Sequence, residues 1–269
     1  MAASLSAGQT LVVEFVGLPG VGKSHAARLV GARLEAAGIP VGSAALRVNH
    51  ELGTTRRVLY KFGIGAGEML RHPTSPVRVG RALIRSRQQS RFDVVRLSYN
   101  WFFLVGLLRR VRKRPGVELL DEGTVQQLWS IAFAGGEDTI RECSTELLEA
   151  SPTARPLPDV VVLVEAPIGL VESRVKARRS RAGRLDRMEL AERQPALVRG
   201  SRLFDELLAA DGPSSASRLR RVRNADAREF GADIDALVDE LVTDLTGQRR
   251  GARGDAGRFG RTSRRRARA

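Results

Sequence analysis

The sequence has few of the residues on which many functional sites depend. Its 269 residues include one cysteine, Cys143, which excludes an internal disulfide framework and favours a reducing compartment. The three histidines, His25, His50 and His72, are scattered and, with one cysteine, do not form a transition-metal cluster. No apolar run reaches the roughly 18 residues of a membrane-spanning helix, and no basic segment precedes the first apolar run as in a secretory signal. These absences predict a cytoplasmic protein without a transmembrane segment.

Lysine is scarce as well, and the positive charge is unevenly distributed. Only 4 of the 45 basic residues are lysines, and the formal net charge is +15. Residues 248–269 contain 9 arginines and one aspartate, which gives +8, and residues 77–114 contain 11 basic residues and Asp93, which gives +10. Subtracting both segments from +15 leaves −3 for the rest of the chain. The body of the protein is therefore not generally basic, and the two segments need separate explanations.

One glycine-rich segment carries the clearest chemical signal. Residues Gly17–Ser24 read GLPGVGKS and fit the phosphate-loop pattern G-x-x-x-x-G-K-[ST]. An apolar, β-branched run at 11–16 precedes the loop, and helical spacing follows it, which counts against a chance match in an ordinary turn. In this setting the loop's N–H groups form an anion nest, Lys23 reaches the β- and γ-phosphates, and the Ser24 hydroxyl ligates Mg²⁺.

Apolar runs and helical spacings alternate along the rest of the chain. Strands are expected at residues 11–16, 41–48, 117–120, 160–165 and 219–222. Helices are expected at residues 24–37, 54–70, 124–133, 139–150, 168–179, 185–210 (with Pro195 as a candidate break) and 226–245, with one or two more over 77–114. Strands that alternate with helices of ten or more residues predict a three-layer α/β domain around a five-stranded parallel sheet. Residues 1–247 form this domain, and 248–269 have almost no large apolar residues and are expected to be disordered.

Two acids follow the third expected strand. Asp121 stands at its carboxyl end, where a Walker B aspartate organises Mg²⁺, and parallel α/β sheets bind ligands at that edge. The alternative is an ordinary surface acid after an edge strand. Glu122 could accept a proton from an acceptor hydroxyl or bind Mg²⁺ through water, or it could be a solvated acid at the start of the next helix.

An arginine-rich segment follows the fourth expected strand. Arg174 and Arg178 are four residues apart on one helical face, and Arg181 falls near the same side if the helix continues. Guanidinium groups stabilise the charge that phosphoryl transfer spreads over the equatorial oxygens. Gly183 suits a segment that closes over a nucleotide. A solvated arginine face is the alternative.

These features together resemble the P-loop nucleoside and nucleotide kinases, most closely the thymidylate-kinase-like group, over roughly residues 10–245. The resemblance rests on GLPGVGKS, on LLDEG, on PDVVVLVEAP leading into RVKARRSRAGR, and on residues 185–189. It implies a three-layer P-loop NTPase fold with a helical insert at about 77–114 and an arginine-rich lid at about 174–187. It also implies ATP and Mg²⁺ as cofactors.

The resemblance and the motifs together define the candidate site residues. The nucleotide-binding residues are Gly17, Leu18, Pro19, Gly20, Val21, Gly22, Lys23, Ser24 and His25, with Asn224 near the adenine. The catalytic residues are Lys23, Asp121, Glu122, Arg174, Arg178 and Arg181. The metal ligands are Ser24 and Asp121.

Two departures from the family pattern concern the acceptor. Thymidylate kinases typically follow the third-strand aspartate with an arginine that grips the acceptor's phosphate, and here Glu122 stands instead. Their Arg-Glu-Pro-Gly-Gly-Thr segment corresponds only to HELGT at 50–54. A carboxylate suits a neutral hydroxyl better than a phosphate dianion, so we hypothesise an alcohol acceptor such as a nucleoside, a sugar or another metabolite.

The two basic segments leave several interpretations open. In the kinase interpretation, the 77–114 insert lines the acceptor pocket, with aromatic rings to stack on a ligand and arginines to bind anions. The candidates are Tyr99, Trp101, Phe102, Arg85, Arg91 and Arg96. The alternatives are a buried or dimer-forming helix face, which is favoured for the aromatics, and an arginine-flanked helix at a membrane surface. The tail, including Arg264–Arg266, could bind nucleic acid or an anionic surface, but a solvated extension is favoured.

The sequence therefore predicts an ATP-dependent phosphotransferase that acts on a small-molecule acceptor. The alternative is a nucleotide-switched P-loop ATPase that binds nucleic acid or a protein partner through its basic segments. A guanine-reading Asn-Lys-x-Asp motif and an ABC-type Leu-Ser-Gly-Gly signature are both absent.

Overall fold

A single all-parallel sheet organises the chain. The computed structural model describes residues 10–263 apart from 46–47, 49–52, 89, 136–139, 152, 154–155, 178–184 and 186–187, with side chains placed up to residue 246 except at 54, 140 and 190. The strands lie in the order β2-β3-β1-β4-β5. Their bounds are Thr10–Val16 (β1), Val41–Gly42 (β2), Gly116–Leu120 (β3), Val160–Glu165 (β4) and Arg218–Arg223 (β5). The expected five-stranded parallel sheet is confirmed.

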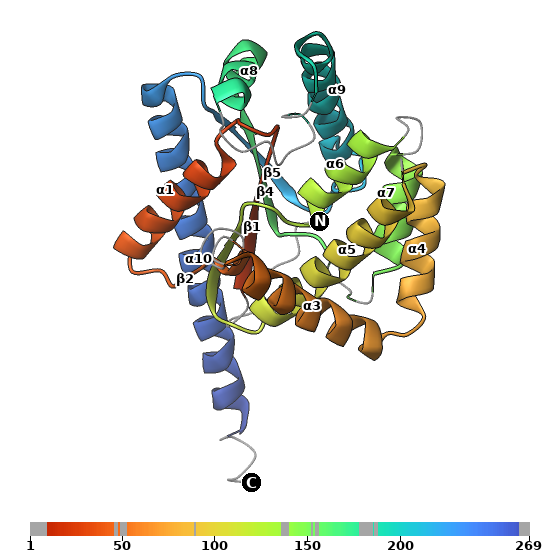
Figure 1. Ribbon diagram of the computed structural model, residues 1–269. Coiled ribbons are helices and arrows are strands. Elements are labelled where there is room, and N and C mark those ends of the chain that lie inside the picture. The colour runs from red at the N-terminus through yellow and green to blue at the C-terminus, as the bar shows by residue number, and fades with distance from the viewer. Residues whose placement is uncertain are drawn as a thin grey trace.

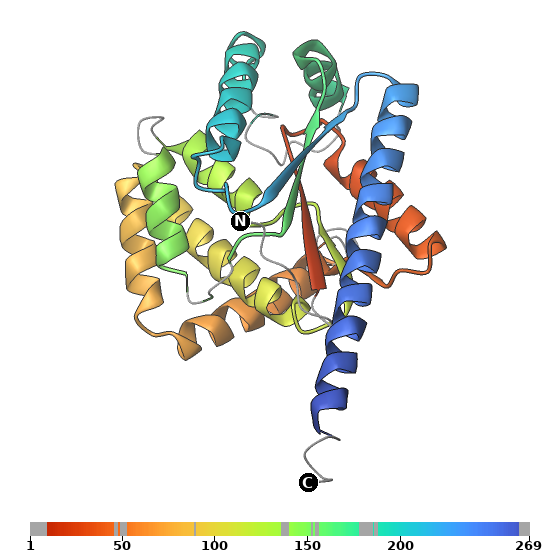
Figure 2. The same cartoon turned by 180° about the vertical axis from the view of Figure 1, so that it is seen from behind.

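Helices cover both faces of this sheet. They are α1 (Lys23–Ala36), α3 (Thr54–Arg71), α4 (Ser75–Arg85), α5 (Arg91–Val111), α6 (Thr124–Ala134), α7 (Ile140–Glu149), α8 (Ile168–Ala177), α9 (Leu190–Leu208) and α10 (Ala227–Ser263). Figures 1 and 2 show α1 and α10 on one side and α3 to α7 on the other, with α6 packed on β1 and α5. No helix in the described part of the chain is long and apolar enough to cross a membrane.

The central strand explains why two distant loops meet. Every residue of β1 is buried, as expected for a parallel strand covered on both faces. β1 pairs with β3 on one side, where Glu14 lies opposite Leu120, and with β4 on the other. The residues that follow β1 and β3 therefore emerge side by side at the carboxyl edge of the sheet.

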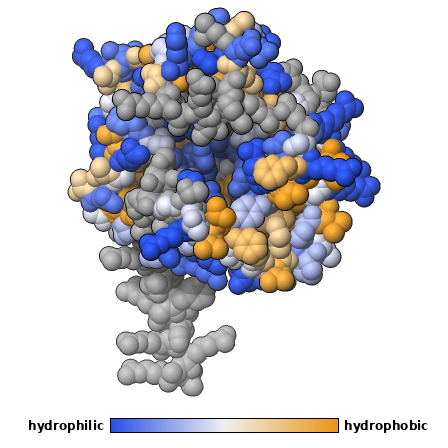
Figure 3. Space-filling view, in the orientation of Figure 1, coloured by the Kyte–Doolittle hydropathy of each residue, from blue (hydrophilic) through white to orange (hydrophobic). Residues whose placement is uncertain are grey.

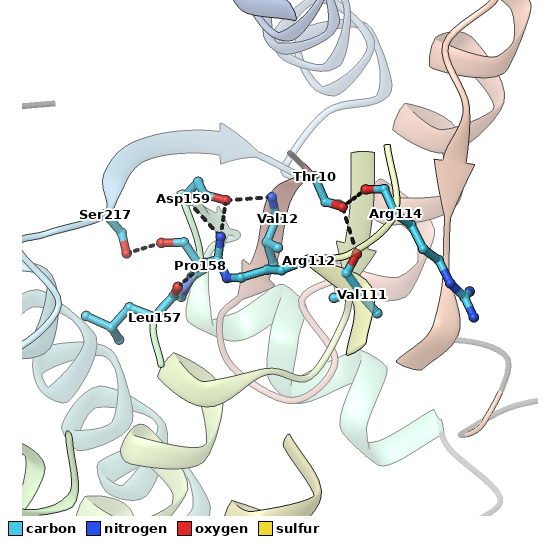
Figure 4. Close-up of polar contacts among 9 residues, drawn as sticks. All are labelled: Thr10, Val12, Val111, Arg112, Arg114, Leu157, Pro158, Asp159 and Ser217. Atoms are coloured by element: carbon cyan, nitrogen blue, oxygen red, sulfur yellow. Dashed lines mark hydrogen bonds and ion pairs between the residues drawn. The ribbon is translucent and has the colours of Figure 1, made fainter. Parts of the chain in front are cut away.

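A polar cluster fastens the opposite, amino-terminal edge (Figure 4). Asp159, just before β4, accepts the N–H of Val12 at 2.8 Å and pairs with Arg112 at 3.0 Å. Arg112 also donates to the Leu157 carbonyl at 2.7 Å. The Thr10 hydroxyl donates to the Val111 carbonyl at 2.7 Å and also contacts the Arg114 carbonyl. This cluster ties the end of α5 to the starts of β1 and β4.

The second strand is shorter than the expected 41–48. Only Val41 and Gly42 pair with β3, and Ala44 is already helical. The Glu118 carboxylate of β3 accepts the N–H of Ala44 at 2.6 Å and lies where a side chain on Gly42 would be. Because the Ala44 N–H is bonded to this side chain, it is not available to pair with the backbone of β3, and the chain leaves the sheet.

Two helices also differ from expectation. α9 begins at Leu190 rather than 185 and runs unbroken through Pro195, which lies in its second turn, where a proline removes only one backbone hydrogen bond. α10 runs to Ser263, so residues 248–263, expected to be disordered, are helical, and Figure 1 shows this end projecting from the body. Arginine and alanine favour helices, and a helix that has already started gains a hydrogen bond with each residue. The domain boundary at 247 stays a prediction.

Candidate active site

The glycine-rich loop lies between β1 and α1, as the motif predicts. Gly17, Gly20 and Gly22 have φ values of 145°, 93° and 105°, in the region that favours glycine. A side chain on Gly17 would come 2.5 Å from the Val164 carbonyl oxygen, and one on Gly22 would collide with the Asn224 amide. The glycines are therefore required both by backbone conformation and by the closeness of neighbouring strands.

Residues from β5 and α8 hold this loop in place. The Asn224 side chain donates to the Val21 carbonyl at 2.7 Å, and its backbone N–H donates to the Glu165 carbonyl at 2.7 Å. Arg174 Nη1 also approaches the Val21 carbonyl, at 3.4 Å. Asn224 thus contacts the loop itself, and its predicted place near an adenine stays a prediction. Arg174 lies beside the loop, and its role as a cation for the phosphates stays a prediction.

The two predicted halves of the site meet at Ser24 and Asp121. The Ser24 hydroxyl donates to Asp121 Oδ2 at 3.0 Å, and Asp121 is only 3% exposed. Lys23 Nζ donates to the carbonyls of Gly17, at 2.8 Å, and Leu18, at 3.3 Å, so the lysine folds over its own loop. Spacing along the chain predicted this convergence, because adjacent parallel strands end at the same edge.

A cavity of about 740 Å³ opens beside these residues. The loop and the Asp121–Glu122 turn form one part of its wall, and α3, α5 and α6 form another. The lining residues are Pro19, Gly20, Gly22, Lys23, Ser24, His25, Arg57, Lys61, Arg96, Leu97, Asn100, Phe103, Leu104, Asp121, Glu122, Gly123, Gln126, Gln127, Trp129 and Ser130. This volume is in the usual range for small-molecule sites.

The wall away from the loop combines cations with one exposed acid. Arg57 and Lys61 of α3 and Arg96 of α5 line the cavity together with Glu122. Lys61 Nζ lies 5.0 Å from the centre of the Phe103 ring. Burial lowers the pKa of Lys61, and the neighbouring carboxylate of Glu122 acts in the opposite direction. Anions and hydroxyl groups would both find partners here.

Glu14 is a central residue of the site that sequence reasoning missed. Its fully buried carboxylate accepts the N–H groups of Gly123, Val125 and Gln126 at 3.2, 3.2 and 2.7 Å, and so caps α6. The Gln126 side chain accepts the N–H of Gly17 at 3.1 Å. Burial raises the pKa of Glu14 to about 7, although the backbone hydrogen bonds oppose this. The available signal was a charged residue inside an otherwise apolar strand.

The aromatic residues proposed for the pocket lie elsewhere. Trp101 and Phe102 are completely buried in the core, which confirms the alternative interpretation of a buried helix face. Tyr99 is outside the cavity lining, and its hydroxyl donates to the Val58 carbonyl at 3.0 Å. Phe103 lines the cavity instead. Hydrophobic spacing predicted an apolar helix but did not specify which side faces the ligand.

The arginine candidates divide in the same way. Arg96 lines the cavity, whereas Arg85 pairs with Glu146 and Arg91 lies outside the lining. Arg178 and Arg181 lie outside the described residues, so the lid stays a prediction. His25 lines the cavity and stacks on Phe230 of α10, with ring centres 5.6 Å apart.

Two solved structures are similar to this chain. A deoxyadenosine kinase from M. mycoides, solved with dCMP and a flexible dCDP, is 13% identical with a TM-score of 0.48, over 87% of this chain and 99% of that one. A thymidylate kinase from Candida albicans is 14% identical with a TM-score of 0.49, over 90% of this chain and 95% of that one. No protein-family model and no curated protein sequence matches the chain. The parallel sheet, with β1 at its centre and the glycine-rich phosphate-loop motif between β1 and α1, gives this protein a three-layer α/β fold of the P-loop type.

Proposed function

We propose that this protein transfers the γ-phosphoryl group of ATP to a small-molecule acceptor in an Mg²⁺-dependent reaction. The observation that carries this proposal is the 3.0 Å contact between Ser24 and Asp121 at the rim of one cavity. That contact brings together the loop expected to bind phosphates and the acid expected to organise the metal. If the loop were an ordinary turn and Asp121 an ordinary surface acid, Ser24 and Asp121 would have no functional reason to be in contact.

The donor side of the cavity suits a triphosphate. The loop at the start of α1 directs backbone N–H groups and the helix dipole toward an anion. Lys23, now bonded to the loop's carbonyls, is the cation that would exchange these partners for phosphate oxygens. Arg174 adds a second positive charge beside the same loop. Their contribution would be positioning and charge stabilisation, which is most of what phosphoryl transfer requires.

The residues at the rim also fit Mg²⁺. Mg²⁺ prefers hard oxygen ligands and usually takes only one or two from the protein, with water and substrate phosphates completing its shell. The Ser24 hydroxyl and the Asp121 carboxylate supply two such oxygens. In the described residues, no group of three or more histidines, cysteines or acids could hold a metal, so a protein-only metal cage is not offered there. When bound, Mg²⁺ would neutralise charge on the β- and γ-phosphates.

Glu122 supports an alcohol as the acceptor. It is exposed and lines the cavity next to Asp121, where it could accept the proton of an acceptor hydroxyl. The acceptor oxygen would form a bond to the γ-phosphorus as the bond to the bridging oxygen breaks, and ADP would leave. Arg178 and Arg181, beyond α8, are proposed to close over the nucleotide during this step.

The proposal is tested by acceptor-dependent release of ADP from MgATP. Nucleosides, nucleotides and sugars form the acceptor panel, and DNA and RNA are added in separate arms. We expect release that requires a small alcohol, and a loss of at least about a hundredfold in Lys23→Ala. Lys113→Ala, an exposed lysine beyond α5, is the matched control and keeps full activity.

Three outcomes would contradict this proposal. Release stimulated only by nucleic acid would favour the nucleotide-switched ATPase. Efficient use of dTMP with no alcohol accepted would contradict the role given to Glu122. Unchanged activity in a folded Lys23→Ala variant would contradict the whole assignment.

A further inference from the structure

Five large apolar side chains at one end of α3 and α5 face solvent. They are Val58, Leu59 and Phe62 of α3, exposed by 55%, 65% and 60%, and Phe92 and Val95 of α5, exposed by 76% and 67%. We call these five residues the α3–α5 patch. Figure 3 shows orange side chains gathered on the part of this face where α3 and α5 lie in Figure 1. A gathering of exposed apolar side chains on one face favours an interaction site.

The two halves of the patch are joined through Tyr99. Its ring stacks on Phe62 with centres 6.3 Å apart, and its hydroxyl donates to the Val58 carbonyl at 3.0 Å. The other face of α3 is already buried against α5 through Ile64 and Glu68, which are 2% and 0% exposed. The patch is therefore a second apolar face of α3, and the core does not use it.

The charges around the patch select the kind of partner. Helices α3 and α5, which carry the patch, contain 8 arginines and lysines and only two acids, Glu68 and Asp93. Glu68 is buried and bound by Arg109, and Asp93 is paired with Arg96. A second copy of the chain docked about a two-fold axis would bring like charges together, because the same surface occurs on both sides. A negatively charged surface would instead complement these helices.

We propose that the α3–α5 patch docks on an anionic lipid bilayer. Apolar and aromatic side chains on one helix face, flanked by arginines, suit the boundary between headgroups and acyl chains. The described helices do not span a membrane, so the contact is at its surface. α3 also supplies Arg57 and Lys61 to the cavity, and docking through α3 brings this wall of the cavity next to the headgroups. This inference does not depend on the proposed reaction.

The test is flotation of the full-length protein with lipid vesicles. One set contains phosphatidylcholine alone, and the other contains phosphatidylcholine with one third phosphatidylglycerol. We expect partition onto the anionic vesicles, weakened by salt, and at least about tenfold weaker partition of a Leu59→Ser/Phe62→Ser variant. Both residues are exposed, so the variant keeps its fold, which thermal unfolding checks.

Val77→Ser provides the matched control. Val77 is 74% exposed and lies in α4, beyond the C-terminal end of α3. The patch is near the other end of α3, where Leu59 is roughly 16 Å along the helix from Leu70. This variant is expected to bind vesicles like the wild type. Equal binding by the Leu59→Ser/Phe62→Ser variant would assign lipid binding to the basic tail and overturn the proposal. Absence of vesicle binding, with a dimer in sedimentation that the same variant dissociates, would make the patch a contact between chains and would also overturn it.

Discussion

At the scale of single residues, the buried carboxylate of Glu14 joins the two loops that form the candidate site. It caps α6, just after the Asp121–Gly123 turn, and accepts the backbone N–H of Gln126. The Gln126 side chain in turn accepts the N–H of Gly17. A side chain on Gly123 would collide with this carboxylate, so the turn and the acid depend on each other. Glu14 is a positioning residue, because its carboxylate contacts backbone N–H groups and not the cavity.

We predict that Glu14 makes stability depend on pH. Its pKa is about 7 in the folded protein against 4.5 ordinarily, so the folded chain binds more protons between these values. The free energy of unfolding therefore falls as pH rises from about 4.5 to about 7, by about 3 kcal/mol, since each pKa unit is worth about 1.4 kcal/mol. Glu14→Gln lacks this dependence. Urea unfolding of both proteins from pH 5 to 8 measures it, and parallel stability profiles would exclude the effect.

Gly22 is a loop position with no room for an added methyl group. In Gly22→Ala the new side chain would collide with Asn224 at a φ of 105°, and we expect at least about tenfold weaker ATP binding. Gly38→Ala is the matched control, because its φ is 74° but nothing lies within 4 Å of the added carbon. Calorimetric titration with ATP compares the two variants. Equal losses of affinity would mean that backbone strain alone, rather than the loop's contact with Asn224, is responsible.

Residue types and spacing predicted only part of this site. The loop and Asp121 could be located because each follows an apolar strand directly, and parallel strands bring such ends together. Glu14 was missed because a strand pattern does not reveal that a buried acid will meet the N-terminus of a distant helix. For Trp101 and Phe102 the sequence favoured a buried helix face, which the structure confirms, although the apolar run at residues 101–108 gave no sign of which side faces a ligand.

At the scale of elements, the amino-terminal cluster of Figure 4 supports the sheet without touching the cavity. In Asp159→Ala the carboxylate that contacts both Arg112 and the Val12 N–H is lost, and we expect the free energy of unfolding to fall by about 3 kcal/mol. ATP affinity should stay unchanged, because the site lies at the other edge of the sheet. Denaturant unfolding and ATP titration measure the two quantities.

An exposed ion pair provides the control for this prediction. Arg141 and Asp211 pair at 2.8 Å with side chains exposed by 51% and 75%, so Asp211→Ala should leave stability unchanged. If both variants lost a similar amount of unfolding free energy, burial would not explain the contribution of the Arg112–Asp159 pair to stability.

The elements themselves were largely predictable, apart from those governed by particular contacts. β1 and β4 are long apolar runs and match their expected bounds closely. β2 was predicted too long because the contact between Glu118 and Ala44 is between segments far apart in sequence. α9 passes through Pro195 and α10 continues to Ser263 because an established helix tolerates residues that would not begin one.

At the scale of the whole molecule, no described residue that lines the cavity belongs to the basic tail. The cavity is lined by residues between Pro19 and Ser130, whereas residues 248–269 carry +8 beyond the body. We predict that a chain ending at residue 247 keeps its acceptor-dependent ADP release and its KM for ATP. Steady-state kinetics of the two chains test this. A large loss in a folded truncated protein would favour an ATPase coupled to nucleic acid or to a partner through the tail.

Joint binding of MgATP by the glycine-rich loop and Asp121 is the basis of the proposed function. Its most direct test is the Mg²⁺ dependence of ATP affinity in the wild type and in Asp121→Asn, which keeps the side-chain shape but removes the charge. We predict that Mg²⁺ strengthens ATP binding to the wild type and adds at least about tenfold less in the variant, while binding without Mg²⁺ is similar in both. The same response to Mg²⁺ in both proteins would contradict the account.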